Sequence, residues 1–328
     1  MKDCLKRNNY ISGVWFGAAL AILIALPLVI SRSWLSITTE ILILSVAACG
    51  LNLLIGYCGR VNFGPAGLYA VGAYATGLFL EKTNIPFGAA MLAGPVMAGI
   101  ISFPIGWFCV RCTSHYFALL SLAFGQIIWA AIHSWYSFTG GDDGIAGIRA
   151  PDFLMSITSY YYFTLVIVII CLVLLWMISH SSLGKTLQAI RENQHRAEFI
   201  GINSKRYLLI AFIVQGFFLG VAGSLYCGFS HAIFPVYASF LKGNDILIPC
   251  ILGGIYNFTG PIVGVTVYII LTKIISAYTM YWLLFLALII IFVVLFLRGG
   301  IVGFISERLS AIEEKRGIRG DIEGRESY

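Results

Sequence analysis

HSSLGKTLQAIRENQHRAEFIGINSKR, residues 180–206, is a polar stretch between two long apolar runs. It carries five Lys and Arg residues and two Glu residues. A short loop this rich in Lys and Arg is retained in the cytoplasm when its flanking segments cross a membrane. The stretch therefore predicts a cytoplasmic loop between two membrane spans, and it sets the orientation of the rest of the chain.

The same loop has helical signals. Ser182 suits an N-cap, Gly201 stands where a C-cap is expected, and Glu192 and Arg196 have i,i+4 spacing. Four apolar residues fall near one face: Leu187, Ile190, Ala197 and Ile200. An amphipathic helix at this place rests on lipid or docks into a partner protein. The alternative is an ordinary basic linker that stabilises the topology.

Composition excludes a soluble globular protein. The 328 residues are 59% hydrophobic and 11% charged, with a mean hydropathy of +0.90; soluble domains carry roughly 25% charged residues. Apolar runs long enough to cross a bilayer recur along the chain. We predict an all-α polytopic integral membrane protein with about 8–10 transmembrane segments, some of them broken or re-entrant, estimated by counting apolar runs.

Counting spans gives the topology. The apolar run from Ile11 to Ile30 predicts a retained first span, and a cytoplasmic N-terminus then returns the 180–206 loop to the cytoplasm after six spans. The Gly- and Ala-rich run 66–80 predicts a span inside the bundle. Residues 245–276 must start and finish outside, so they predict a hairpin. We predict that residues 1–297 form a membrane domain and that 298–328 form a charged cytoplasmic tail.

Two segments pair an Asn-Phe sequence with a Gly-Pro step. They contain Asn62, Phe63, Gly64 and Pro65 in the first break, and Asn257, Phe258, Gly260 and Pro261 in the second. Such breaks free backbone groups that lipid cannot satisfy, so they are tolerated where they line a cavity or are buried in protein. Matching breaks predict two weakly related halves and a substrate path. The alternative is a pair of tight turns at the membrane edge.

Several site chemistries are unsupported by the sequence. The net charge of +6 comes largely from Lys and Arg at the expected cytoplasmic side, so we predict no nucleic-acid partner. Cys109 and Cys112 make one CxxC without the second pair that a zinc site needs, so no metal is expected. No catalytic set of nucleophile, base and acid can be assembled, so we do not expect an enzyme.

The sequence has only weak signals for nucleotide binding and for ion coupling. Residues 179–186 approach the nucleotide-binding loop but have Ser179 where its first Gly stands, and they follow a membrane span instead of a strand. No cofactor is therefore expected on this chain. Few ionisable residues lie near the apolar runs: Glu40, Arg111, His115, His133, His231, Asp245 and Lys273. This scarcity argues against a self-sufficient ion-coupled carrier without excluding that class.

Ordered motifs extend this interpretation. They are GLNLLIG (50–56), NFGPAGLYAVGAY (62–74), YFALLSLAFG (116–125), TGGDDGI (139–145), LGKTLQAIREN (183–193), AEFIGIN (197–203), LGG (252–254) and GP (260–261). In these stretches the chain resembles the branched-chain amino acid permeases of bacterial ABC importers, the LivM-like family. At the first break it has Asn62 and Pro65 where many members have Ser and His.

The resemblance implies alternating access powered by partner subunits. Residues 183–201 would be a coupling helix seated in a cytoplasmic ABC ATPase that uses ATP and Mg²⁺. The residues of this role are Gly184, Lys185, Leu187, Ala189, Ile190, Arg191, Glu192, Asn193, Ala197 and Gly201. A second related permease, a periplasmic or extracellular solute-binding protein, membrane lipid and a small-molecule substrate are the other expected partners, in a bacterial inner membrane. The solute would be a branched-chain amino acid or a similar small polar molecule; urea and short amides are alternatives.

Overall fold

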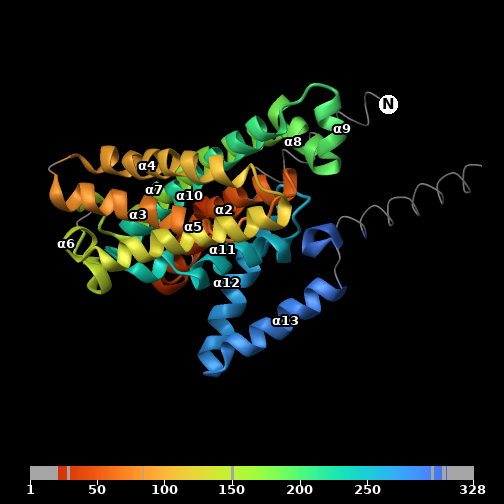
Figure 1. Ribbon diagram of the computed structural model, residues 1–328. Coiled ribbons are helices and arrows are strands. Elements are labelled where there is room, and N and C mark those ends of the chain that lie inside the picture. Colours follow the sequence, from red (N-terminus) through yellow and green to blue (C-terminus); the bar gives the residue numbers. More distant parts are fainter. Residues whose placement is uncertain are drawn as a thin grey trace, which may run out of the picture.

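The computed structural model describes residues 21–27, 30–83, 85–148, 151–296, 299–304 and 308. Its longer helices are α2 (Arg32–Asn52), α3 (Pro65–Lys82), α4 (Phe87–Cys109), α5 (Ser114–Ser134), α7 (Ile157–His180), α8 (Ser182–Glu192), α10 (Ser204–Ser230), α11 (Phe240–Gly253), α12 (Gly260–Tyr278) and α13 (Trp282–Phe296). Short elements are η1 (Leu53–Tyr57), α6 (Tyr136–Thr139), η2 (Gly141–Asp143), η3 (Asp152–Leu154), α9 (Gln194–Phe199) and η4 (Pro235–Ala238). Strands β1 (Ile145–Ala146) and β2 (Ala232–Ile233) pair antiparallel. Figure 1 shows the resulting helical bundle.

Among the described residues, six helical segments are long and apolar enough to cross a membrane. They are Arg32–Tyr57, Phe87–Cys109, Ser114–Ser134, Ile157–His180, Ser204–Ser230 and Gly260–Tyr278. α3, which ends in Glu81 and Lys82, is not among them, and α11 and α13 are shorter. The prediction of an all-α polytopic membrane protein is confirmed.

Small residues allow the centre of the bundle to pack closely. α10 packs against α3, α4 and α2. A Cβ atom added at Gly72 of α3 would collide with the backbone of Gly220 on α10, and one at Gly94 of α4 would collide with Ser224. Glycine at such contacts lets helix axes approach, which is how helices associate in lipid. The run 66–80 therefore lies inside the bundle, as the sequence predicted.

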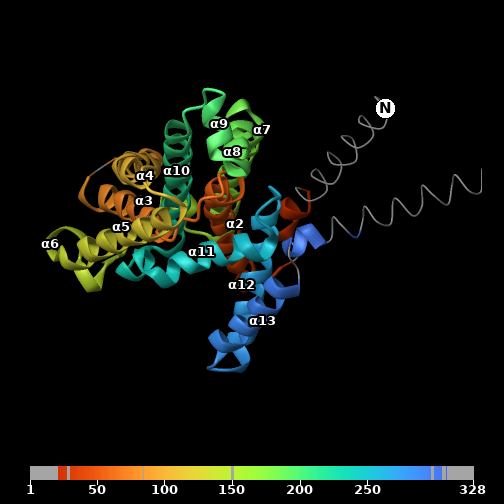
Figure 2. The same ribbon diagram turned by 45° about the vertical axis from the view of Figure 1, so that its right-hand side comes forward.

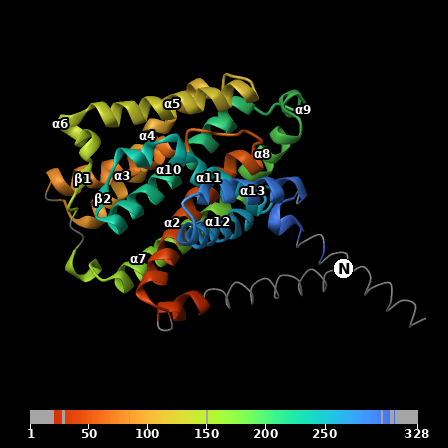
Figure 3. The ribbon, with the colours of Figure 1, turned by 90° about the horizontal axis from the view of Figure 1, so that it is seen from below.

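The connections alternate between two ends of the bundle. α8 and α9 lie at one end, and α6 with the β1–β2 pair lies at the other (Figure 3). α11 and α12 are consecutive helices that pack on each other and turn at residues 254–259, so the expected hairpin is observed. α12 and α13 project from the remaining helices (Figure 2). We refer below to the end that holds α8 and α9 as the loop end.

Two expected segments, the first span and the tail, fall mostly on residues outside the described ranges. Of the first span, Ile11–Ile30, residues 21–27 and 30 are described, and 21–27 are helical. Of the tail, 298–328, residues 299–304 and 308 are described, and 300–304 and 308 are helical. The cytoplasmic placement of both termini therefore stays a prediction.

Candidate functional site

The segment 182–201 forms two helices where the sequence predicted one. α8 ends at Glu192, Asn193 is extended, and α9 follows at an angle. Asn193 Oδ1 accepts a hydrogen bond from the backbone N–H of Arg196 at 2.9 Å, so Asn193 is the N-cap of α9. This break also removes the expected i,i+4 relationship between Glu192 and Arg196. Gly201 has a φ of 90° just after α9, as expected of a C-terminal glycine.

Burial divides this segment into an inner and an outer face. Leu187, Ile190 and Ala197 are buried against the chain itself, where α8 packs on α7, α10 and η1. Phe199 and Ile200 are instead 91% and 73% exposed at the tip of α9. The expected single apolar face is therefore wrong for Ile200, because the turn at Asn193 rotates α9 relative to α8. Phe199 was not singled out from the sequence.

The remaining residues of the expected coupling set lie on both faces. Gly184 is buried; Ala189 and Arg191 are half-buried; Lys185, Glu192, Asn193 and Gly201 are exposed. Gln194 Nε2 donates to Glu198 Oε1 at 2.9 Å, and this hydrogen bond lowers the pKa of the exposed Glu198 carboxyl. The exposed side of the segment thus carries charged groups around the Phe199 and Ile200 tip.

Basic side chains join this segment to both Gly/Pro breaks. The Arg191 guanidinium donates to the backbone oxygen of Gly56 and lies 5.1 Å from the centre of the Tyr256 ring. Arg60 Nη2 donates to Gln194 Oε1 at 2.6 Å. Gly56 and Arg60 precede α3, and Tyr256 precedes α12. One short segment therefore contacts the start of both break-and-helix units.

The first break is tightly buried against α5. Asn62 Oδ1 accepts from the Gly64 N–H at 2.8 Å, and the Phe63 N–H donates to Ser121 Oγ at 3.2 Å. A Cβ at Gly64 would collide with the Ser121 carbonyl. Pro65 then begins α3, where the missing N–H of proline costs nothing. Asn62 Nδ2 is buried and has no hydrogen-bond partner among the described residues.

The second break repeats this local design. Gly254 ends α11 with a φ of 113°, and Pro261 lies in the first turn of α12. The Gly260 N–H donates to the Asn257 carbonyl at 3.1 Å, and Asn257 and Phe258 are half-buried. The segments that precede the two breaks meet at the loop end, because a Cβ at Gly56 would collide with the carbonyl of Ile255. The similarity is local, and a relation between whole halves stays a prediction.

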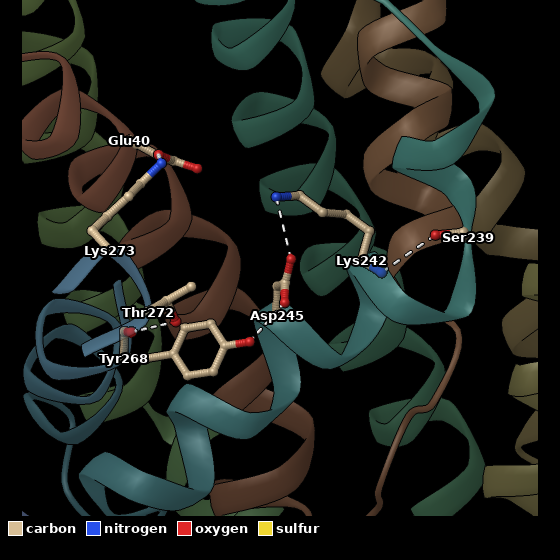
Figure 4. Close-up of polar contacts among 7 residues, drawn as sticks. All are labelled: Glu40, Ser239, Lys242, Asp245, Tyr268, Thr272 and Lys273. Atoms are coloured by element: carbon tan, nitrogen blue, oxygen red, sulfur yellow. Dashed lines mark hydrogen bonds and ion pairs between the residues drawn. The ribbon is translucent and has the colours of Figure 1, made fainter. Parts of the chain in front are cut away.

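Charged residues from three helices come together in the other half of the bundle. Glu40 of α2 pairs with Lys273 of α12 at 3.5 Å, and Lys242 and Asp245 of α11 pair at 3.5 Å (Figure 4). Glu40, Asp245 and Lys273 were noted from the sequence as isolated charges near span ends, and Lys242 was missed. No described residues gather three or more His, Cys, Asp or Glu side chains that could hold a metal ion.

Comparisons with known proteins agree with this architecture. Residues 33–295 match the family model described as "Branched-chain amino acid transport system / permease component". The chain is 25% identical over 264 residues to the high-affinity branched-chain amino acid transport system permease protein LivM of Escherichia coli (strain K12), a match covering 72% of this chain and 62% of that protein. The chain thus spans less than two thirds of the length of this relative.

Two further relatives carry related names. The permease protein LivH of the same system in Escherichia coli (strain K12) is 27% identical over 257 residues, which cover 71% of this chain and 82% of LivH. The guanosine ABC transporter permease protein NupP of Bacillus subtilis (strain 168) is 27% identical over 136 residues, or 36% of this chain and 39% of NupP. No solved structure matches the chain. The match over 33–295 shows that the chain belongs to the branched-chain amino acid transport system permease family.

Proposed function

We propose that this chain is a transmembrane subunit of an ATP-driven ABC importer in a bacterial inner membrane. Its solute would be a branched-chain amino acid or a similar small polar molecule. The family membership and the relatives' printed names support this class of transporter. The chain supplies the path and the mechanical connection, and ATP would be hydrolysed with Mg²⁺ in separate ATPase subunits.

The observation that carries the proposal is the two-sided α8–α9 segment. Its tip exposes Phe199 and Ile200, which suit an apolar groove of a cytoplasmic partner. Its inner side is anchored by buried Leu187 and Ile190, so a force on the tip moves α8 as a body. We therefore propose that α9 contacts the ATPase and that α8 transmits the displacement.

Arg191 connects α8 to the segments that precede α3 and α12, so it could transmit a displacement of α8 to them. Because its guanidinium contacts both Gly56 and Tyr256, movement of α8 would act on the starts of α3 and α12 together. The residues of the two breaks, including Asn62 and Asn257, would then open or close the inner end of the path. A second related permease would complete the path, and an external binding protein would deliver the solute.

An uptake experiment tests this proposal. Radiolabelled leucine, urea and guanosine are offered to cells that express the complete transporter, with either the ATP pool or the ion gradients collapsed. The proposal predicts uptake of at least one solute that stops on ATP depletion and survives a protonophore while ATP is maintained. Uptake that follows the gradient and ignores ATP would overturn it.

One observation favours a second candidate, a self-sufficient ion-coupled carrier. Glu40 and Asp245 are carboxylates within membrane-spanning helices, where ion-coupled carriers hold such groups. Each already has a Lys partner, which an importer without ion coupling also tolerates. The same uptake experiment separates the two candidates, since only the carrier follows the proton or sodium gradient.

A further inference from the structure

The charged cluster of Glu40, Lys242, Asp245, Tyr268 and Lys273 lies away from the loop end. Glu40 is in the N-terminal half of α2, Lys242 and Asp245 are near the start of α11, and Lys273 is near the end of α12. Tyr268 OH donates to Asp245 Oδ1 at 2.7 Å. Charged groups in membrane helices are costly, and they usually mark a path for ions or polar solutes. A structural role alone would be served by apolar contacts at lower cost.

The two ion pairs are loosely held. Each has a nitrogen-to-oxygen distance of 3.5 Å, whereas charge-assisted N–H···O bonds are usually about 2.7–2.9 Å. The side chains are also partly open: Lys242 is 14% exposed, Glu40 20%, Asp245 37% and Lys273 49%. Each of these four groups can therefore bind a further polar group while it stays close to its present ion-pair partner, so that no buried charge is left unpaired.

Aromatic side chains form a wall beside the charges. The Lys242 ammonium lies 5.4 Å from the centre of the Tyr226 ring, and Tyr237 packs edge-on against Tyr226 at 5.1 Å. The Tyr69 ring centre lies 6.1 Å from that of Tyr226, but Tyr69 is fully buried. The half-buried Tyr226 and Tyr237 therefore supply the apolar surface of this wall.

Figure 4 shows how the charged ends are arranged. In this view the Lys242 ammonium and the Glu40 carboxylate point toward one another, with Asp245 below Lys242 and Lys273 below Glu40. Two positive and two negative groups leave the cluster neutral. A solute with one charge of each sign preserves that balance, whereas a net ion would leave one charge without a counterpart.

We propose that this cluster binds the zwitterionic end of an α-amino acid on its way through the permease. Lys242 donates to the solute carboxylate, Glu40 accepts from the solute ammonium, and the tyrosine wall contacts the solute side chain. Asp245 with Tyr268 positions Lys242, and Lys273 positions Glu40. This inference rests on the proposed importer function and narrows its solute to zwitterions in preference to urea, amides or nucleosides.

A binding experiment on the purified membrane complex, without its solute-binding protein, tests the site. Leucine is compared with leucinamide, which lacks the carboxylate, and with 4-methylpentanoate, which lacks the ammonium. We expect the wild type to prefer leucine to each analogue by about tenfold or more, since a lost contact of about 1.4 kcal/mol gives that factor. Lys242→Gln should abolish the preference over leucinamide only, and Glu40→Gln the preference over 4-methylpentanoate only.

Glu81→Gln is the matched control, because Glu81 is an exposed carboxylate at the end of α3 outside the cluster. It should retain both preferences. Complexes are compared at equal yield and equal elution volume, so that a variant that fails to assemble is recognised. If Lys242→Gln fails to assemble, Lys242→Met replaces it, and if Glu40→Gln fails, Glu40→Ala replaces it. Equal preferences in wild type and variants, or no saturable binding of millimolar leucine to the wild type, would overturn the site.

Failure of this site is distinguishable from failure of the importer proposal. ATP-dependent uptake of urea or guanosine with no leucine binding would leave the importer standing and reject the zwitterion site. Leucine binding with the expected analogue pattern, but with uptake that follows an ion gradient, would retain the site and reject the importer.

Discussion

Arg191 donates a hydrogen bond from its guanidinium to the backbone carbonyl of Gly56, although the two residues belong to α8 and to the π-helical turn that ends α2. The same guanidinium lies over the ring of Tyr256. Arginine can serve a planar ring and a carbonyl together because its flat cation both stacks and donates in fixed directions. Arg191 therefore joins α8 to η1 and to the segment that precedes α12.

Replacing Arg191 should uncouple ATP hydrolysis from transport. We expect Arg191→Ala to lower leucine uptake by about tenfold, the factor given by loss of one charge-assisted hydrogen bond of about 1.5 kcal/mol, while ATP hydrolysis continues. Arg191→Lys should rescue little, since a Lys ammonium cannot stack and donate in the same geometry. Lys185→Ala, an exposed cation of the same helix, is the control. Unchanged uptake per ATP in Arg191→Ala would refute the transmission role.

Leu187 should matter for folding. It is fully buried, so Leu187→Asp places an unpaired charge inside the chain and should destabilise it by about 3 kcal/mol or more. Lys185→Asp, two residues away and exposed, should leave stability within about 0.5 kcal/mol. Thermal unfolding in detergent and the amount of protein in the membrane measure both. A stable, fully inserted Leu187→Asp protein would contradict the inner-face packing.

The contact between α3 and α10 depends on small residues. Gly72→Ala places a methyl group against the Gly220 backbone, and we expect a loss of about 1–3 kcal/mol from overpacking. Gly99→Ala is matched in chemistry, but its new methyl meets no atom within 4 Å, so it should be neutral or should stabilise α4 by up to about 1 kcal/mol. Unfolding temperatures compare the two variants. Equal values would show that the helices can separate at no cost.

Variants of Asn62 can distinguish a role in the turn before α3 from a role in the solute path. Asn62→Ala removes the acceptor for the Gly64 N–H and should cost about 1 kcal/mol of stability, the usual net value of one hydrogen bond. If the unpartnered Asn62 Nδ2 also faces the solute path, the KM for uptake should rise as well. Asn257→Ala is the companion variant at the half-buried second break. Loss of stability with unchanged uptake kinetics in both variants would assign these residues to the turns alone.

Sequence reasoning located the membrane helices because apolar length and loop charge are local properties. The expected span 66–80 lies within α3 at Pro65–Lys82, and the expected loop 180–206 lies between the apolar helices α7 at Ile157–His180 and α10 at Ser204–Ser230. The spacing of Ile200 was misread because Asn193 caps a second helix and changes its direction. An Asn between two short polar helical runs was the available signal for that break.

The charged cluster was beyond the reach of the sequence for another reason. Glu40, Asp245 and Lys273 were each visible as a charge near an apolar run, but their pairing depends on which helices become neighbours. α2 meets α11 and α12 through packing between distant parts of the chain. A single sequence does not show directly which helices are in contact. Lys242, near the start of α11, was not among the residues singled out.

The proposed contact between α9 and an ABC ATPase can be tested by purification from the native membrane. The tagged chain is compared with a Phe199→Asp, Ile200→Asp double variant. Both side chains are exposed, so the variant should insert and fold normally while its α9 tip no longer fits an apolar groove. Mass analysis should find an ABC ATPase and a second permease with the wild type, and the second permease without the ATPase for the variant. A wild-type chain that purifies alone would contradict the proposed importer. A variant that retains the ATPase at full yield would contradict the α9 contact.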